Sequence, residues 1–131
     1  MDKPPIHPTA QTQPFWQACR EGRLLYQVCG DCGGTPPIPG ALCARCHGGR
    51  LQWRESAGRG VVLSHTTVHR APTPAFKGDL PYVIALVDLD EGFRLMVNVR
   101  DARTPVIGQR VRIDFEPRGP DRLPIAVLET P

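Results

Sequence analysis

Apolar and polar residues alternate over most of the second half of this chain. The alternation is clearest at 82–90 and continues at 93–100. A period of two is typical of a β-strand with one buried face. Runs at 60–70, 110–116 and 124–128 have the same character. The pattern therefore predicts five strands in the part of the chain that follows residue 55.

The connections between these strands indicate how they are joined. Asp90-Glu91-Gly92 suits a hairpin turn, because Gly92 can take a positive φ. A long first strand followed by hairpins matches the five-stranded oligonucleotide/oligosaccharide-binding (OB) barrel. An SH3-like barrel is the second topology that fits. The fold class expected is mainly β, with one short helix near the N-terminus.

Two Cys-x-x-Cys motifs, Cys29–Cys32 and Cys43–Cys46, lie between short strands predicted at 24–28 and 51–54. Each motif can direct two thiolates to one point, and two such motifs complete a tetrahedral sulfur shell that suits Zn²⁺. Four protein ligands leave no position for water or substrate. The motifs therefore predict a rubredoxin-like zinc ribbon whose metal has a structural role.

Other uses of these cysteines fit less well. A rubredoxin-type iron site has similar spacing and stays open as an alternative. Disulfides need an oxidising compartment, and the chain opens with a polar, proline-rich stretch that does not resemble a signal peptide. Cys19 lies outside both motifs, and we expect it to be a buried free thiol.

Residues 14–22 predict a short helix. Pro14 stands in its first turn and Gly22 just past its end, which is the usual distribution of these two residues. Phe15 and Trp16 contribute to its apolar face. Because so short a helix is marginal alone, it must dock, either on the chain's own ribbon and barrel or on a partner subunit. Phe15 and Trp16 are the candidates for docking to a partner.

Composition narrows the function classes. The chain has 131 residues and a net charge of +3, which is too mild a charge to indicate nucleic acid as the main partner. Its apolar runs are all too short to cross a membrane. We expect a cytoplasmic protein with no membrane partner.

The sequence offers no catalytic constellation. It lacks a nucleophile elbow and a glycine-rich phosphate loop, and its carboxylates are scattered. His65 and His69 would share one face of a strand, but about 13 Å apart, at roughly 3.3 Å per residue. The chain is therefore predicted not to be an enzyme. The long connection 71–81 is the better functional candidate, since loops on rigid barrels often bind ligands.

Several motifs together resemble a known family, the acyl-CoA-associated zinc-ribbon/OB-fold proteins long classified as a domain of unknown function. They cover nearly the whole chain from Phe15 onward: Phe15-Trp16-x-Ala18-x-x-x-Gly22-x-Leu24, Cys29-Gly-Asp-Cys32-Gly33, Pro37, Cys43-x-x-Cys46, Trp53, Ser56-Ala-Gly58-Arg59-Gly60-Val61-Val62, Thr67-Val68-His69-Arg70 and Pro81-Tyr82.

The resemblance implies a function that spacing alone does not. Members of this family are non-catalytic partners of thiolase-superfamily enzymes, such as acyltransferases and steroid side-chain aldolases, or of MaoC-like enoyl-CoA hydratases. It implies that the four cysteines of the two Cys-x-x-Cys motifs, which we call knuckles, bind structural zinc. It also implies that the region 70–81 lies near the partner's acyl-CoA path, with Arg70, Phe76, Lys77 and Tyr82 as candidate contacts.

We therefore expect three parts: a tail and helix (1–23), a zinc ribbon (24–55) and an OB-fold domain (56–131). The expected function is an accessory or scaffold subunit that stabilises a thiolase-like enzyme and lines its acyl-CoA channel. Two alternatives remain: a free-standing acyl-CoA-binding module and a single-strand nucleic-acid-binding protein.

Overall fold

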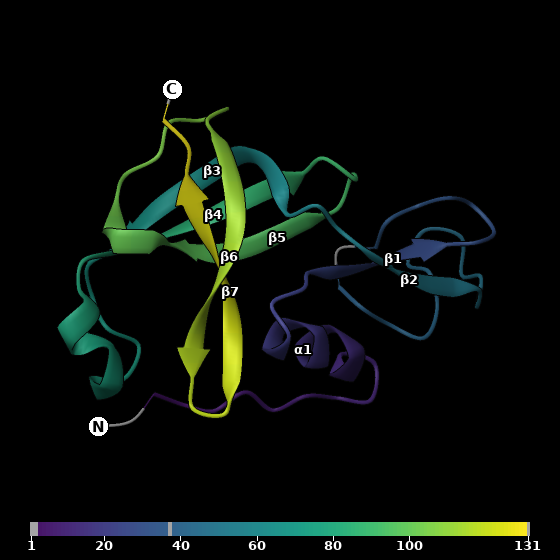
Figure 1. The fold of residues 1–131 in the computed structure, drawn as a ribbon, viewed down its shortest axis with the longest axis horizontal. Helices are drawn as coiled ribbons and strands as arrows, with labels where there is room; N and C mark the ends of the chain where they lie inside the picture. The colour runs from purple at the N-terminus through teal and green to yellow at the C-terminus, as the bar shows by residue number, and fades with distance from the viewer. Residues whose placement is uncertain (1–2, 37, 131) are drawn as a thin grey trace.

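A computed structural model describes residues 3–36 and 38–130, so Pro37 of the family motif lies outside the described residues. The fold is mainly β and consists of a two-stranded ribbon beside a closed five-stranded barrel (Figure 1). Its elements are α1 (Gln13–Arg20), β1 (Leu25–Cys29), β2 (Leu51–Glu55), β3 (Arg59–Val68), the 3-10 helix η1 (Pro74–Asp79), β4 (Tyr82–Leu89), β5 (Arg94–Val99), the 3-10 helix η2 (Arg100–Ala102), β6 (Arg110–Arg118) and β7 (Asp121–Leu128).

The barrel has the strand order β3-β4-β5-β7-β6, and β3 also pairs with β6 to close it. All of its strand pairs are antiparallel except β5 and β7, which run parallel. The predicted OB-fold is thus confirmed. β3 serves two neighbours because it curls, with a register shift between Val62 and Ser64. Gly60 is required at the start of this curl, because a Cβ there would collide with the backbone of Asp88.

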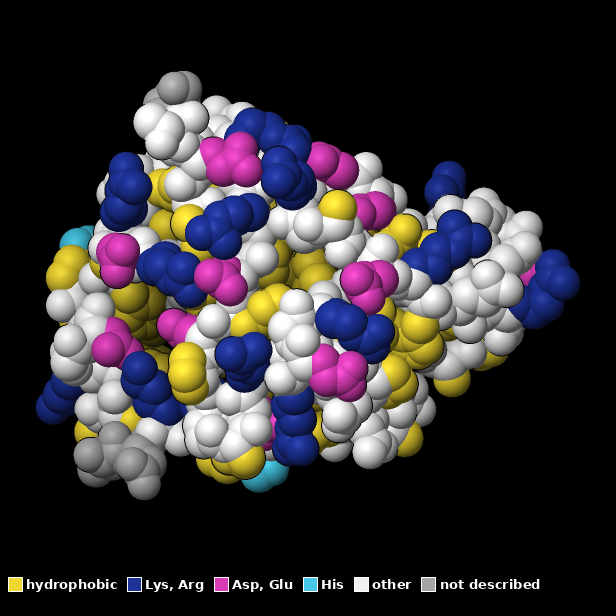
Figure 2. All heavy atoms as spheres, viewed as in Figure 1, with side chains coloured by type: hydrophobic (Ala, Val, Ile, Leu, Met, Phe, Trp, Pro, Cys, Tyr) yellow, Lys and Arg dark blue, Asp and Glu magenta, His cyan; other side chains and the backbone are white. Residues whose placement is uncertain are grey.

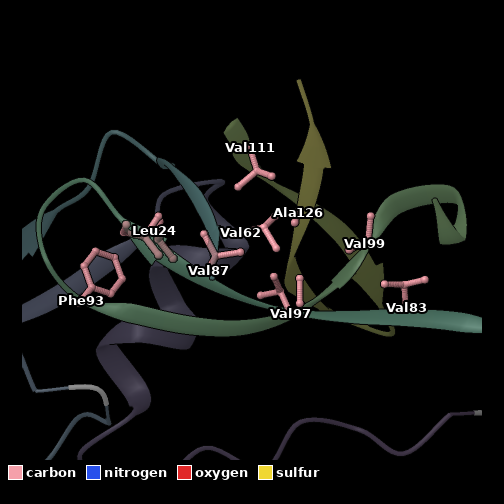
Figure 3. Packing of buried hydrophobic residues seen from close by; sticks show 11 residues of the cluster. Leu24, Val62, Val83, Val87, Phe93, Val97, Val99, Val111 and Ala126 are labelled. Carbon is pink, nitrogen blue, oxygen red and sulfur yellow. The ribbon is translucent and has the colours of Figure 1, made fainter. Parts of the chain in front are cut away.

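The core is formed by the inward-facing residues of the alternating strands. Val83, Ala85, Val87 and Leu89 of β4 are all buried, as the alternation predicts. Figure 3 shows aliphatic side chains of β3, β4, β5, β6 and β7 meeting inside the barrel, with Leu24 and Phe93 at one end. Burying this set of aliphatic side chains is the main source of the barrel's stability.

The ribbon is joined to the barrel by side chains as well as by the chain. Leu24, just before β1, is buried in the barrel core, and Tyr26 stacks on Phe93 with ring centroids 4.7 Å apart. Glu91, in the β4–β5 turn, accepts hydrogen bonds from the Ser56 hydroxyl and the Ala57 amide, at 2.7 and 2.8 Å. These contacts fix the ribbon against one end of the barrel.

Helix α1 packs between the ribbon and the barrel, against β7 and β1 (Figure 1). Ala18 and Cys19 are buried, and the Arg20 guanidinium donates to the buried Asp121 carboxylate at 2.5 Å. Of the two docking surfaces considered from the sequence, the structure therefore shows the first: the helix packs on the ribbon and barrel of its own chain.

Two expectations differ from the structure. The connection 71–81 is not simply a loop, because residues 74–79 form η1, in which Phe76 is half-buried. Strand β7 begins at Asp121, ahead of the predicted start at residue 124. Pro124, which has no N–H to donate, lies inside the paired β6–β7 hairpin, opposite Phe115.

Candidate functional site

The four knuckle cysteines converge as a metal shell. The sulfur atoms of Cys29, Cys32, Cys43 and Cys46 all lie within 4.8 Å of one another. The Sγ–Sγ distance is 3.5 Å between Cys29 and Cys46 and 3.7 Å between Cys32 and Cys43. A tetrahedron with Zn–S bonds of about 2.3 Å has sulfur–sulfur edges of about 3.8 Å. The donor set therefore fits structural Zn²⁺ with every coordination position filled by protein.

The two knuckles use the same backbone design. The amide of Cys29 donates to the Gly34 carbonyl and that of Cys43 to the Gly48 carbonyl, each at 2.8 Å. In both, the residue after the second cysteine is left-handed: Gly33 has φ 73° and His47 φ 62°. His47 thus occupies a turn position that favours glycine, and it is not one of the four residues that surround the metal site.

Backbone amides around the sulfurs favour thiolates, whereas the cysteine side chains oppose one another: despite the Gly48 amide, Cys29 and Cys32 raise the pKa of the Cys46 thiol to about 12. The amides of Gly34, Arg45 and Gly48 each donate to a knuckle sulfur at 3.4 Å. The backbone amides of Cys46 and Arg45 lower the pKa of the Cys43 thiol to about 7. A thiol that loses its proton readily is a better zinc ligand near neutral pH.

The first knuckle is held from outside by an arginine. Arg50 donates through Nε to Asp31 at 2.7 Å and through Nη2 to the Gly30 carbonyl at 3.2 Å. In return, the Gly30 amide donates to the Arg50 carbonyl at 2.7 Å. These bonds fix the turn between Cys29 and Cys32 and so help to orient both sulfurs.

Cys19 has a different environment from the knuckle cysteines. It is fully buried in α1, and burial raises the pKa of its thiol to about 12. Such a thiol stays protonated and unreactive near neutral pH. This is the buried free cysteine that its position outside the motifs predicts.

The candidate loop borders a polar hollow of about 610 Å³. Its lining includes Phe76 and Tyr82, whose ring centroids are 6.4 Å apart, together with Lys3, Asp79, Arg100 and Arg118. The Lys3 ammonium pairs with Asp79 at 2.7 Å and lies 5.7 Å from the Phe76 ring centroid. The Arg118 guanidinium lies 5.8 Å from the same ring.

The four residues predicted to contact the acyl-CoA therefore fall into two groups. Phe76 and Tyr82 come together at the hollow, whereas Arg70 and Lys77 are exposed and line neither the hollow nor the groove described next. Lys3 and Arg118 were missed in the sequence, because nothing in their local pattern indicates that both would reach one ring on a distant loop.

A second cavity, which we call the apolar groove, lies where α1, the ribbon and the barrel meet. It has a volume of about 390 Å³. Both predicted docking residues, Phe15 and Trp16, line it, and their rings pack edge to face with centroids 5.0 Å apart. Phe15 also packs against the barrel core. Two strongly exposed side chains, Ile38 and Met96, complete its apolar lining.

The hollow and the groove adjoin, because Ile84, Asn98 and Glu116 line both. Figure 2 shows hollows on the face in view, with hydrophobic side chains on their floor and charged side chains of both signs around them. The face is therefore amphipathic and is not a basic strip.

Four arginines of the barrel, Arg94, Arg100, Arg110 and Arg112, pair with acids. Arg110 donates two hydrogen bonds of 2.9 Å to Asp90, and this contact lowers the pKa of the Asp90 carboxyl. Arg100 and Arg112 both pair with Asp114, whose pKa is lowered by the Phe115 amide and by Arg100. These paired guanidinium groups alternate with acids, so they do not form a uniformly basic face.

Comparison with known proteins places the chain in a family. Residues 16–52 match the family model of the ChsH2 rubredoxin-like zinc ribbon domain, and residues 53–116 match that of the ChsH2 C-terminal OB-fold domain. The chain belongs to the ChsH2 (DUF35) family. The resemblance stated from the sequence is thus confirmed, and the zinc-ribbon model together with the four-cysteine cluster supports zinc as the structural metal.

Individual relatives agree with this assignment. A DUF35 domain-containing scaffold protein of Methanocaldococcus jannaschii is 30% identical over 76% of this chain and 73% of its own length. A solved structure described as Ltp2-ChsH2(DUF35) aldolase matches with a TM-score of 0.81 and 32% identity, over 96% of this chain and 98% of that one.

Another relative is much longer. A Thermomonospora curvata protein described as a probable enoyl-CoA hydratase alpha subunit is 42% identical over 88 residues, which are 65% of this chain. The match spans only 26% of that protein's length. Within residues 3–36 and 38–130 of the ChsH2-family chain, no helix is both long and apolar enough to span a membrane.

Proposed function

We propose that this chain is a non-catalytic accessory subunit of a thiolase-superfamily acyl-CoA enzyme complex. The observation that carries the proposal is its match, along nearly its whole length, to the chain from the structure described as Ltp2-ChsH2(DUF35) aldolase. A scaffold role is also in the name of the archaeal relative. A MaoC-like hydratase is the other partner class, supported by the name of the longer relative.

The chemistry of the described residues supports a binding role. The metal shell has four protein sulfurs and no open position, so it offers no Lewis acid to a substrate. The catalytic groups would then come from the partner. In this proposal the tail and helix (1–23) and the ribbon (24–55) dock against the enzyme, and the OB-fold domain (56–131) presents η1 and its flanking residues to the acyl-CoA.

The exposed cations near η1 are suited to an anionic ligand. Arg70 and Lys77 are exposed, and neither forms an ion pair with another residue in the described ranges 3–36 and 38–130. A guanidinium and an ammonium group can bind the phosphates of CoA as a fork and a point charge. Phe76 and Tyr82, whose ring centroids are 6.4 Å apart, add an aromatic pair from the same stretch of the chain.

The first test is affinity purification of the chain from its host, with mass spectrometry of the proteins that co-elute. A stoichiometric thiolase-like or hydratase-like enzyme supports the accessory role. Recovery of the chain alone, or with nucleic acid that salt removes, contradicts it.

The second test uses the complex recovered in the first. Arg70→Ala combined with Lys77→Ala should raise the KM for the acyl-CoA while the complex still assembles. Arg59→Ala combined with Arg103→Ala removes two other exposed cations and is the matched control. Unchanged assembly and turnover in the loop variant would remove η1 and its neighbours from the acyl-CoA path.

A free-standing acyl-CoA-binding module is the second candidate, favoured by the adjoining groove and hollow within a single chain. It requires that the isolated chain bind CoA thioesters, which calorimetry can measure. The accessory-subunit proposal instead requires the partner for tight binding, so the same titration with and without partner separates the two.

A further inference from the structure

Strand β5 is paired on both sides only at its end. Along one side it pairs with β4 from Arg94 to Asn98. Along the other it pairs with β7 only at Asn98 and Val99. Within the described residues, the ladder therefore leaves 94–97 with no strand on the second side. This is an open sheet edge inside a barrel that closes only beyond it.

The register shows which groups face the open side. The Leu89 amide donates to the Phe93 carbonyl at 2.8 Å, so these two residues form a hydrogen-bonded pair of the β4–β5 hairpin. Such pairs alternate along an antiparallel ladder. Leu95 and Val97 thus exchange hydrogen bonds with β4, while Arg94 and Met96 direct their N–H and C=O groups away from β4, toward the open side.

The open edge lies along the apolar groove, whose lining includes Arg94, Met96 and Trp16. Met96 has 72% of its surface exposed, and Ile38, on the ribbon side of the groove, has 74%. Helix α1 packs on β7 and β1, so it does not replace the missing strand.

Free edges of this kind are normally protected in soluble proteins. Lysine, proline or a bulge usually blocks the pairing of another chain. Residues 94–97 contain none of these, and Arg94 is their only charge. An exposed edge with an apolar border is a template for an added strand.

We propose that an extended apolar segment of the partner subunit adds to the β5 edge and fills the apolar groove. The inference rests on the proposed function and specifies how the partner docks. The segment would exchange main-chain hydrogen bonds with Arg94 and Met96, and its apolar side chains would cover Met96, Ile38 and Trp16.

The chemistry of the edge selects this occupant. A partner helix keeps its own backbone groups bonded internally, and an acyl chain has no groups to bond, so either would leave the amides of Arg94 and Met96 without a partner. An extended peptide satisfies them and places alternate side chains in the groove.

The test is residue-resolved amide hydrogen exchange on the free chain and on the complex recovered with its partner. We expect the amides of Arg94 and Met96 to exchange at least about tenfold more slowly in the complex, because they gain partners. Those of Leu95 and Val97 should change little, because β4 already binds them. The alternation distinguishes an added strand from simple covering of the surface.

A variant tests the same edge by affinity. Met96→Lys keeps the strand backbone and adds the charge that natural edges use, and we expect it to weaken partner binding by at least about tenfold. Val106→Lys is the matched control, since Val106 is equally apolar and 70% exposed but lies outside the groove. It should bind the partner normally.

Each contrary outcome is distinct. A bound partner with uniform or no protection at 94–97 overturns the added strand and leaves the accessory role intact. Protection that appears when the chain alone is concentrated assigns the edge to a second copy and overturns the inference. Failure to find any partner overturns the proposed function and this inference together.

Discussion

The ribbon and the barrel differ in what holds them together. Between residues 25 and 55, the only buried hydrophobic side chains described are those of Cys29 and Cys43, both metal ligands. The barrel instead buries aliphatic side chains from all five strands, together with Phe93 of the β4–β5 turn. One part depends on metal–sulfur bonds, and the other depends on the removal of apolar surface from water.

This difference explains where apolar residues are exposed. Ile38 and Leu42 have 74% and 60% of their surface exposed in the connection between the knuckles. A region held by four metal bonds does not need these side chains for its own core. They can therefore remain available for an interface, whereas the barrel uses most of its large apolar residues internally.

The largest effect is expected from breaking the metal shell. Cys29→Ser should release zinc and unfold β1 and β2, because structural zinc contributes on the order of 10–16 kcal/mol of apparent binding energy. The barrel should stay folded but lose part of its support from Leu24 and Tyr26. Zinc content and amide exchange of the two parts provide the measurement.

Cys19→Ala is the control for that variant, because it removes a thiol outside the shell and should keep stoichiometric zinc. Full zinc content and protected β1–β2 amides in Cys29→Ser would show that the ribbon does not depend on its fourth sulfur. The contrast between ribbon and barrel would then be wrong.

A core truncation should have the opposite pattern. Ile125 of β7 is 2% exposed, and Ile125→Ala should lower the free energy of unfolding of the barrel by about 2–5 kcal/mol through lost burial and a cavity. Zinc content should not change. Urea unfolding measures the loss, and Ile107→Ala, at a site 67% exposed, is the control and should change stability by less than about 0.5 kcal/mol. Loss of zinc on truncating Ile125 would mean that the two parts unfold as one unit.

These two parts were also predictable to different degrees. The spacing of the cysteines defines the ribbon almost completely, since four thiolates must meet at one metal. The barrel strands follow from alternation, which locates β4 within one residue of its observed end at Leu89. Local periodicity and ligand spacing are both readable from neighbouring residues.

The surfaces between the parts were not predictable in the same way. The apolar groove joins Trp16, Ile38 and Met96, which are far apart in the chain and have no shared local pattern. Phe76 is half-buried because Lys3 and Arg118 approach it from distant segments. The open edge of β5 depends on where β7 departs from it, which is a property of the register and not of composition.

The smallest effect concerns the repeat within the ribbon. His47 and Gly33 occupy equivalent left-handed positions, so the second knuckle carries a side chain where the first has none. A left-handed non-glycine residue costs roughly 1–2 kcal/mol, and glycine recovers less than this because it adds freedom to the unfolded chain. His47→Gly should therefore stabilise the ribbon by up to about 1 kcal/mol.

The reciprocal variant, Gly33→His, should destabilise the ribbon by a similar amount, since no atom lies within 4 Å of a Cβ built there and only backbone strain would act. Competition with a zinc chelator compares the two variants with the parent chain. Equal effects of the same sign would show that the two knuckles, despite their matching hydrogen bonds, are not energetically equivalent.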